Sequence, residues 1–191
     1  CAMFYDLENP KSFVKDIEEI LDDEGIWCVQ ISYLLLMIKN MNFYDICHEH
    51  LSYHSIKSFE NLIKQFKLKI FNAEINEVNG GSIRLYVCKE NCEKYNSKNF
   101  FENLKKLREE ENAYKLEDEN TFFNFQEKID VLKNKTNSYI NKVIQQNKIV
   151  FALGASTKGN ILLQHFGIGK DKIKYISERN PDKVGLRCVG T

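Results

Sequence analysis

The segment between Gly81 and Gly154 contains neither glycine nor proline, the two residues that most often interrupt a helix. Within it, residues 98–147 are rich in Lys, Glu and Asn, and their apolar residues recur at spacings of three, four and seven. This spacing predicts two long amphipathic helices with a break near residues 115–120. Solvated helices that each pack one apolar stripe on a neighbour are the simpler interpretation, and a partner-binding coiled coil is the alternative.

Residues 2–89 alternate between strand-like and helix-like patterns. In chain order they predict a strand end within 2–10, a helix over 11–25, a strand over 26–34, a helix over 55–66, and strands over 68–78 and 82–89. Pro10 and Ser12 suit the start of the first helix, and Gly25 suits its end. The alternation implies parallel pairing, and the turn at 79–81 predicts a hairpin that adds an antiparallel edge.

Three of the four histidines and a glutamate lie together in the segment CHEHLSYH, residues 47–54. The segment follows the carboxyl end of the strand predicted at 26–34. Open α/β sheets bind ligands beyond the carboxyl ends of their strands. A metal site, a loop without chemistry and a proton-transfer site are three interpretations that the residues leave open.

Ligand spacing and side-chain chemistry bear on these interpretations. A zinc site needs several well-spaced ligands, and the segment lacks a CxxC or HExxH frame, so we predict no metal. Histidine has an ordinary pKa of about 6.5, which suits a general base near neutral pH, and a neighbouring carboxylate could orient it. Glu49 and His50 would point to opposite sides of an extended segment, so their cooperation requires a turn.

The segment NKIVFALGASTKGNILLQHFGIG, residues 147–169, differs from the charged helices before it. It predicts a short buried strand, a turn of small residues and a helix start, which together present backbone N–H groups to an anion such as phosphate. Residues 173–185 predict the next strand and its loop, with Glu178 and Asn180 at its carboxyl end. We interpret the whole as a second Rossmann-like unit. The glycine spacing matches neither GxGxxG nor a Walker loop, so a packing turn without a ligand is an equal alternative.

The charge balance and the apolar runs bear on partners and location. Lys plus Arg and Asp plus Glu both number 27, and this neutrality argues against nucleic acid or an anionic membrane as an obligatory partner. The longest apolar run, ISYLLLMI at 31–38, is too short to cross a bilayer. Six cysteines without a repeating CxxC favour free thiols in a reducing, cytoplasmic compartment. The sequence predicts no particular oligomeric state.

Five blocks of the sequence, taken in order, resemble the S-adenosylmethionine-dependent C-methyltransferases of deoxysugar biosynthesis. The blocks are AMFYDLENP, GIWCVQISYL, ICHEHLSYHS, NEVNGGSIRLYV and LGASTKGNILLQHFGIG. In that family a class I methyltransferase domain precedes a C-terminal Rossmann-like domain that helps to hold a nucleotide-linked sugar. The resemblance implies an α/β fold: the C-terminal half of a class I methyltransferase sheet with an antiparallel edge hairpin, followed by helices and a second, partial Rossmann-like domain.

The resemblance implies proton transfer as the role of the histidine segment. His50 matches the histidine that takes the proton from the carbon next to the sugar ketone, and Glu49 matches its acidic neighbour. Either side chain is a candidate for the base itself. The resulting enolate would attack the methyl group of the sulfonium cofactor, and nearby donors would have to stabilise that enolate.

The resemblance also implies contacts for the substrate and the cofactor. Candidate substrate residues before the charged helices are Cys47, His48, Tyr53, Asn79, Gly80, Gly81, Ser82 and Arg84. Candidates for the sugar nucleotide or the domain interface after those helices are Gly154, Ser156, Lys158, Gly159 and Asn160. The candidates near the cofactor, S-adenosylmethionine, are Met3, Phe4 and Tyr5.

The chain departs from the family pattern in two respects. Some members carry tyrosine where this chain has Cys47, and we interpret this thiol as a packing residue. The family's N-terminal zinc-binding cysteines and glycine-rich cofactor loop do not occur in these residues. We therefore expect a fragment that carries the acceptor side of the active site and is inactive alone.

The expected organisation has three parts. Residues 1–90 would be the C-terminal part of the methyltransferase domain, residues 91–147 a helical connector, and residues 148–191 a partial Rossmann-like domain. Two alternatives to sugar C-methylation stay open. The chain could be a non-catalytic module that binds a sugar nucleotide, or it could belong to a methyltransferase that acts on a non-sugar small molecule.

Overall fold

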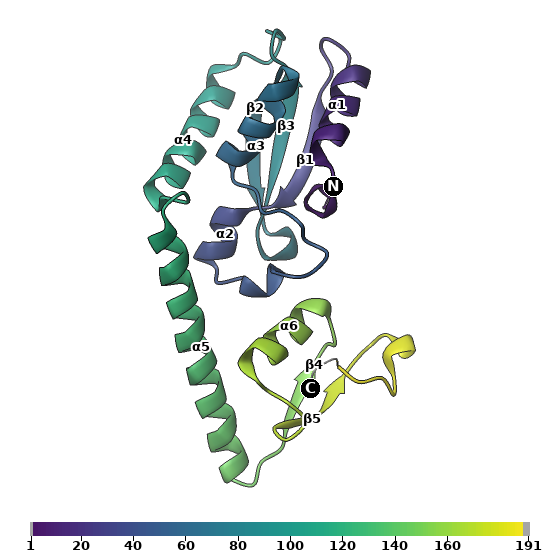
Figure 1. Ribbon diagram of the computed structural model, residues 1–191, viewed down its shortest axis with the longest axis vertical. Coiled ribbons are helices and arrows are strands. Elements are labelled where there is room, and N and C mark those ends of the chain that lie inside the picture. Colours follow the sequence, from purple (N-terminus) through teal and green to yellow (C-terminus); the bar gives the residue numbers. More distant parts are fainter. Residues whose placement is uncertain (1, 189–191) are drawn as a thin grey trace. The chain divides into compact units, whose positions relative to one another are not determined.

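The computed structural model describes residues 2–188 and divides into two compact units. The first unit comprises residues 1–42 and 48–122, and the second comprises 43–47 and 123–191. Helix α4 (Lys98–Tyr114) belongs to the first unit (Figure 1). Helix α5 (Glu119–Gln145) begins in the first unit and belongs to the second from residue 123 onward. The two helices predicted from the apolar spacing are thus confirmed, and Lys115, in the left-handed conformation, ends the first of them. The three-part division of the chain stays a prediction.

The first unit is built around a three-stranded sheet in which the strand order is β1-β3-β2. The strands are β1 (Trp27–Ser32), β2 (Leu68–Asn76) and β3 (Ser82–Lys89). The hairpin of β2 and β3 is confirmed, but β3 lies between β1 and β2 and is antiparallel to both. The direct parallel pairing expected of β1 and β2 is therefore wrong. Five of the eight residues of β3 are buried, which suits a central position.

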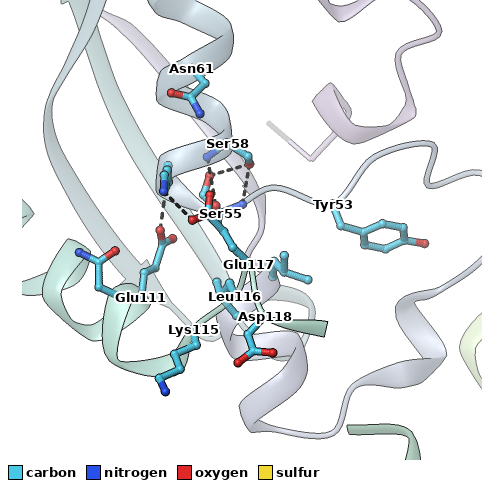
Figure 2. A pocket seen from close by; sticks show the side chains of 12 residues that line it. Tyr53, Ser55, Ser58, Asn61, Glu111, Lys115, Leu116, Glu117 and Asp118 are labelled. Carbon is cyan, nitrogen blue, oxygen red and sulfur yellow. Dashed lines mark hydrogen bonds and ion pairs between the residues drawn. The ribbon is translucent and has the colours of Figure 1, made fainter. Parts of the chain in front are cut away.

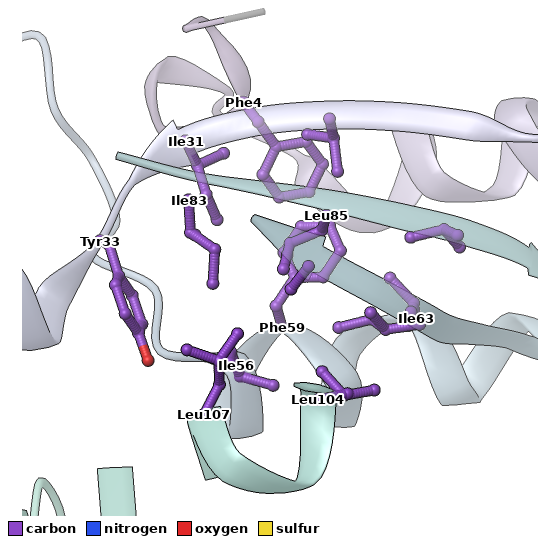
Figure 3. Packing of buried hydrophobic residues seen from close by; sticks show 14 of the residues in the cluster. Phe4, Ile31, Tyr33, Ile56, Phe59, Ile63, Ile83, Leu85, Leu104 and Leu107 are labelled. Atoms are coloured by element: carbon purple, nitrogen blue, oxygen red, sulfur yellow. The ribbon is translucent and has the colours of Figure 1, made fainter. Parts of the chain in front are cut away.

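The core of the first unit lies on one face of this sheet. Alternate residues of the central strand, Ile83, Leu85 and Val87, have at most 1% of their surface exposed and belong to one core cluster. Ile83 and Leu85 face Phe59 and Ile63 of helix α3 (Ile56–Ile63; Figure 3). Leu104 and Leu107 of α4 complete the same cluster. The period of two along the strand and of three to four along the helices predicts this burial.

Several local predictions near the N-terminus are wrong in detail. Residues 2–10 do not form a strand: the Ala2 N–H donates to the Gln30 carbonyl at 2.8 Å, and Phe4–Asp6 form the 3₁₀-helix η1. Helix α1 (Pro10–Ile20) has Pro10 at its start as expected, but Asn9 caps it, because its side chain accepts from the Ser12 N–H. The helix also ends five residues before Gly25.

A short helix, α2 (Leu34–Lys39), was not predicted at all. Its sequence, LLLMIK, is apolar on nearly every side, so periodicity could not separate it from the strand before it. Three of its residues are buried: Leu35, Met37 and Ile38. Among residues 2–188 no helix combines the length and the apolar character that a membrane crossing requires.

The second unit contains the predicted strand-turn-helix-strand element. Strand β4 (Val150–Leu153) pairs in parallel with β5 (Ile173–Ser177), and helix α6 (Thr157–Phe166) connects them. The prediction that this first strand is buried is wrong, because none of the residues of β4 is buried and Leu153 is 89% exposed. Ser156 caps α6 by accepting from the Gly159 N–H, and Gly167 in the left-handed conformation ends it. The fold class expected from the sequence, α/β with a partial Rossmann-like element, is confirmed.

Candidate active site

Two sequence blocks that lie far apart along the chain meet at the carboxyl end of β1. The Leu34 N–H donates to the His54 carbonyl at 3.0 Å, and Tyr33 and His54 form an isolated parallel bridge. The Tyr33 N–H also points to the Gly81 carbonyl at 3.5 Å. The histidine segment and the turn at 79–81 are therefore anchored at adjacent residues of the same strand end, where α/β sheets bind ligands.

Backbone hydrogen bonds fix the middle of the histidine segment. The N–H groups of Leu51 and Ser52 both donate to the Tyr5 carbonyl, at 2.8 and 3.1 Å. The Ser52 hydroxyl lies 2.9 Å from Nε2 of His54. The segment thus has defined contacts on both sides of Tyr53, although it forms no helix or strand there.

The three histidines of the segment have different surroundings. His54 is a core residue, 8% exposed among the rings of Phe4 and Phe59, and burial lowers its pKa, which favours the neutral imidazole. His50 is half-buried, with its ring centroid 4.4 Å from that of Tyr5 and 6.4 Å from that of Tyr53. His48, by contrast, has 87% of its side chain exposed.

Glu49 lies in a turn, as its cooperation with a histidine requires. Its Oε2 atom is 3.5 Å from Nδ1 of His48, and its side chain is about half exposed. The side-chain contact found in the structure therefore joins Glu49 to the preceding histidine. Cys47, before this turn, is partly buried and belongs to the second unit.

The turn at 79–81 has a backbone that depends on its glycines. Asn79, Gly80 and Gly81 all have positive φ, and a Cβ on Gly81 would lie 3.0 Å from Cβ of Leu36. The Gly80 carbonyl accepts hydrogen bonds from the side chains of Asn42, at 2.7 Å, and Asn40, at 3.2 Å. Asn40 and Asn42, which follow α2, therefore stabilise the conformation of this turn.

Ser82 and Arg84 follow the turn on β3. Ser82 is 1% exposed and its hydroxyl donates to the Val78 carbonyl, so it closes the turn from inside. Arg84 lies between Gln30 and Glu74 on the polar face of the sheet. Its guanidinium donates to Gln30 Oε1 at 3.1 Å and lies 3.6 Å from a Glu74 carboxylate oxygen. Part of this guanidinium stays exposed.

The residues expected near a cofactor offer only part of a binding surface. Phe4 is 1% exposed in the core, and Tyr5 is 6% exposed, with its carbonyl already accepting two hydrogen bonds. Met3 has 42% of its surface exposed. These three residues could line one edge of a cofactor but could not enclose it.

In the second unit, the carboxylate of Glu178, the residue after β5, contacts the small-residue turn that precedes α6. Glu178 accepts from the N–H groups of Ala155 at 2.6 Å, Arg179 at 2.7 Å and Asn180 at 3.0 Å. These bonds lower the pKa of Glu178. Gly154 has a positive φ and open space around it, which leaves room for a ligand beside the turn. Buried Oδ1 of Asn160 has no hydrogen-bond partner within residues 2–188.

Comparison with known proteins gives the family. Residues 77–191 match the model of the C-methyltransferase C-terminal domain. The chain belongs to this C-methyltransferase family. It is 27% identical over 185 residues to the C-methyltransferase NovU of Streptomyces niveus, a match that covers 93% of this chain and 43% of NovU. The chain thus spans less than half the length of that curated relative.

A polar pocket of the C-methyltransferase chain, of about 530 Å³, opens beside the N-terminus of α3 (Figure 2). Of the predicted site residues only Tyr53 lines it; the other lining residues are Leu34, Ser55, Lys57, Ser58, Asn61, Glu111, Asn112, Lys115, Leu116, Glu117 and Asp118. Within residues 2–188 no three His, Cys, Asp or Glu side chains gather as they would around a metal ion.

Glu111 of α4 is a further residue that the sequence did not single out. It is 5% exposed, and its carboxylate accepts from the N–H groups of Ile56 and Lys57, the first two residues of α3. The carboxylate therefore caps the helix that follows the histidine segment. Burial raises the pKa of the Glu111 carboxyl. The pKa of Tyr33 is also raised, mainly by the burial of Tyr33 and secondly by the charge of Glu111.

We expect the Glu111→Gln variant to gain stability relative to the wild type as the pH rises. A raised carboxyl pKa in the folded state means that the folded chain binds the proton more tightly. The stability that this tighter proton binding adds to the folded state is fully present below the ordinary pKa of about 4.3. It is lost as the pH rises through the raised pKa of the folded state. Each unit of the raised pKa corresponds to about 1.4 kcal/mol, and glutamine lacks this dependence.

Urea unfolding of both proteins between pH 4 and pH 8 measures this difference. Glu110→Gln is the matched control, because Glu110 is a neighbouring, more exposed residue of α4 that pairs with Lys39. Parallel stability curves for the wild type and Glu111→Gln would contradict the prediction.

Proposed function

We propose that the chain is the acceptor-binding part of an enzyme that methylates a carbon next to the ketone of a nucleotide-linked deoxysugar. One observation carries the proposal: the histidine segment and the turn at 79–81 are anchored at Tyr33 and Leu34, the two residues that directly follow β1. Ligands of α/β folds bind beyond such carboxyl ends of strands. The family supports methyl transfer to carbon. The sugar nucleotide is the substrate that the sequence resemblance implies.

We assign proton abstraction to His50. The α-carbon gives its proton to an imidazole nitrogen, and the electrons of the broken C–H bond move toward the ketone oxygen to form an enolate. His50 is the histidine of the segment that suits this step, because His54 is buried in the core and His48 is almost fully in water. Its contact with the Tyr5 ring would hold the imidazole in one orientation.

Donors near the enolate oxygen would lower the barrier to its formation. The candidates are the hydroxyl of Tyr53, the amide of Asn79 and the backbone of the two glycines that follow it. Arg84 retains an exposed part beside its contacts with Gln30 and Glu74. S-adenosylmethionine, when bound, would supply an electrophilic methyl group, and Met3 is the exposed one of the three residues expected near it.

Within the second unit, the small-residue turn is the candidate site for contacts with a nucleotide. The N–H groups of Ala155 and Gly159 are already used by Glu178 and Ser156. A ligand would therefore rely on the open space beside Gly154 and on Oδ1 of Asn160, a buried acceptor that a ligand N–H or O–H would satisfy.

Deuterium exchange tests the proposed function. The full-length protein is incubated in D₂O with a nucleotide-linked 4-keto-6-deoxyhexose, and deuterium entry next to the ketone is followed by NMR. The matched control is the same sugar nucleotide with a hydroxyl in place of the ketone. We expect enzyme-dependent exchange with the ketone alone, because only its α-proton leaves an enolate behind.

Two other results would point elsewhere. Binding of the sugar nucleotide without exchange or methylation would favour a non-catalytic binding module. Neither binding nor exchange, with methylation of another small molecule, would favour a non-sugar acceptor.

A further inference from the structure

The five residues Phe43–Cys47, which directly precede His48 in the chain, pack within the second unit. The Phe43 ring stacks on Phe166 of α6 with a centroid distance of 5.4 Å, and lies 5.5 Å from the His165 ring. Phe43 and Phe166 are both buried. We call these five residues the leading segment, because the chain runs from them into the histidine segment.

A buried ion pair provides a second attachment of the leading segment to α6. Asp45 has 4% of its side chain exposed, and its carboxylate pairs with Nζ of Lys158. The same ammonium group lies 5.7 Å from the centre of the Tyr44 ring. A carboxylate this far from water is costly unless a cation compensates it, so Lys158 is the charge that allows Asp45 to be buried.

Asp45 and Lys158 each lie next to a segment of the proposed site. Asp45 lies five residues before His50, and Lys158 lies in the first turn of α6, directly after the small-residue turn. We propose that Lys158 is a positioning residue for His50: through Asp45 it fixes the leading segment, and hence the start of the segment that carries the base. This inference rests on the proposed function of His50.

The same geometry argues against Lys158 as a primary phosphate ligand. A phosphate that took this ammonium group would leave the Asp45 carboxylate buried without its cation. The expectation from the sequence that Lys158 contacts the sugar nucleotide is therefore replaced by an indirect role. Substrate contacts in this region are left to the open space beside Gly154 and to Oδ1 of Asn160.

The test compares four variants of the full-length protein: Asp45→Asn, Lys158→Gln, Lys158→Arg, and the charge swap Asp45→Lys with Lys158→Asp. We expect Asp45→Asn and Lys158→Gln each to lower kcat about 10- to 100-fold, as a displaced catalytic group does, with KM for the sugar nucleotide changed less than about threefold. Lys158→Arg keeps the cation and should retain most of the activity. The swap should recover much of kcat if it folds.

A second readout does not depend on catalysis. Amide hydrogen exchange over residues 43–50 should become at least about tenfold faster in Asp45→Asn and Lys158→Gln but not in Lys158→Arg, since the ion pair holds this stretch closed. Unchanged exchange in Lys158→Gln would overturn the positioning role. So would a selective rise in KM for Lys158→Gln, with Asp45→Asn unaffected. Absence of deuterium entry into the sugar with the wild type would count against the proposed function alone.

Discussion

Replacing His50 by alanine in the full-length protein should lower the rate of deuterium entry next to the ketone by about 10²- to 10⁴-fold, the contribution of a general base. Methylation should fall to the same extent, because the enolate must form before the carbon can be methylated. The physical reason is the environment of this ring: it is half-buried and lies against the Tyr5 ring, which would hold the imidazole in one orientation.

His48→Ala is the matched control for this experiment. The two histidines are separated by one residue, but His48 has 87% of its side chain in water and pairs with Glu49. Its loss should change the exchange rate by less than about threefold, as for an exposed side chain without a partner in the chemistry. Equal losses in both variants would contradict the assignment of the base. A loss in Glu49→Gln as large as in His50→Ala would make Glu49 the better candidate.

Replacing Phe59 by alanine should destabilise the first unit by about 3–5 kcal/mol, the usual cost of removing a large buried ring. Phe59 has no exposed surface, and its ring lies 5.1 Å from Phe4, 5.8 Å from Trp27 and 5.8 Å from His54. The cavity would border all three rings. Because His54 ends the histidine segment, the segment should also lose order at this end.

Denaturant unfolding of Phe59→Ala and Phe101→Ala measures the effect. Phe101 of α4 is the matched control, since 64% of its surface is already exposed and its removal should change stability by no more than about 0.5 kcal/mol. A loss below about 1 kcal/mol in Phe59→Ala would mean that this ring is not central to the core.

Local features of the fold could be predicted well from the sequence. The bounds of β3 agree with the expected strand at 82–89, and the turn before it has the positive φ angles that Asn-Gly-Gly favours. Helices α4 and α5 follow from their apolar spacing and from the lack of glycine and proline. In each case a property of neighbouring residues decides the structure. The order of the strands could not be predicted this way, because it depends on which distant edges pair.

The candidate site shows the same limit. The position of the histidine segment at the carboxyl end of β1 follows from topology, and the structure agrees. The roles of individual side chains do not follow. Glu111 caps α3 from a helix more than fifty residues further along the chain, and Asp45 meets Lys158 across an even longer separation. No periodicity or motif connects such pairs, since each depends on burial that only the folded chain creates.

The central place of β3 has a consequence for the growing polypeptide. Of the described strands β1 pairs only with β3. The edge of β1 that faces β3 therefore has no strand partner until residues 33–89 have been synthesised. At roughly 5–20 residues per second this interval lasts several seconds. During that time β1 exposes an unpaired, apolar edge of the kind that recruits other strands. Correct folding of this unit therefore depends on a strand that is synthesised much later than its partner. A pause in translation near the turn at 79–81 would prolong the time during which β1 can pair with the wrong strand.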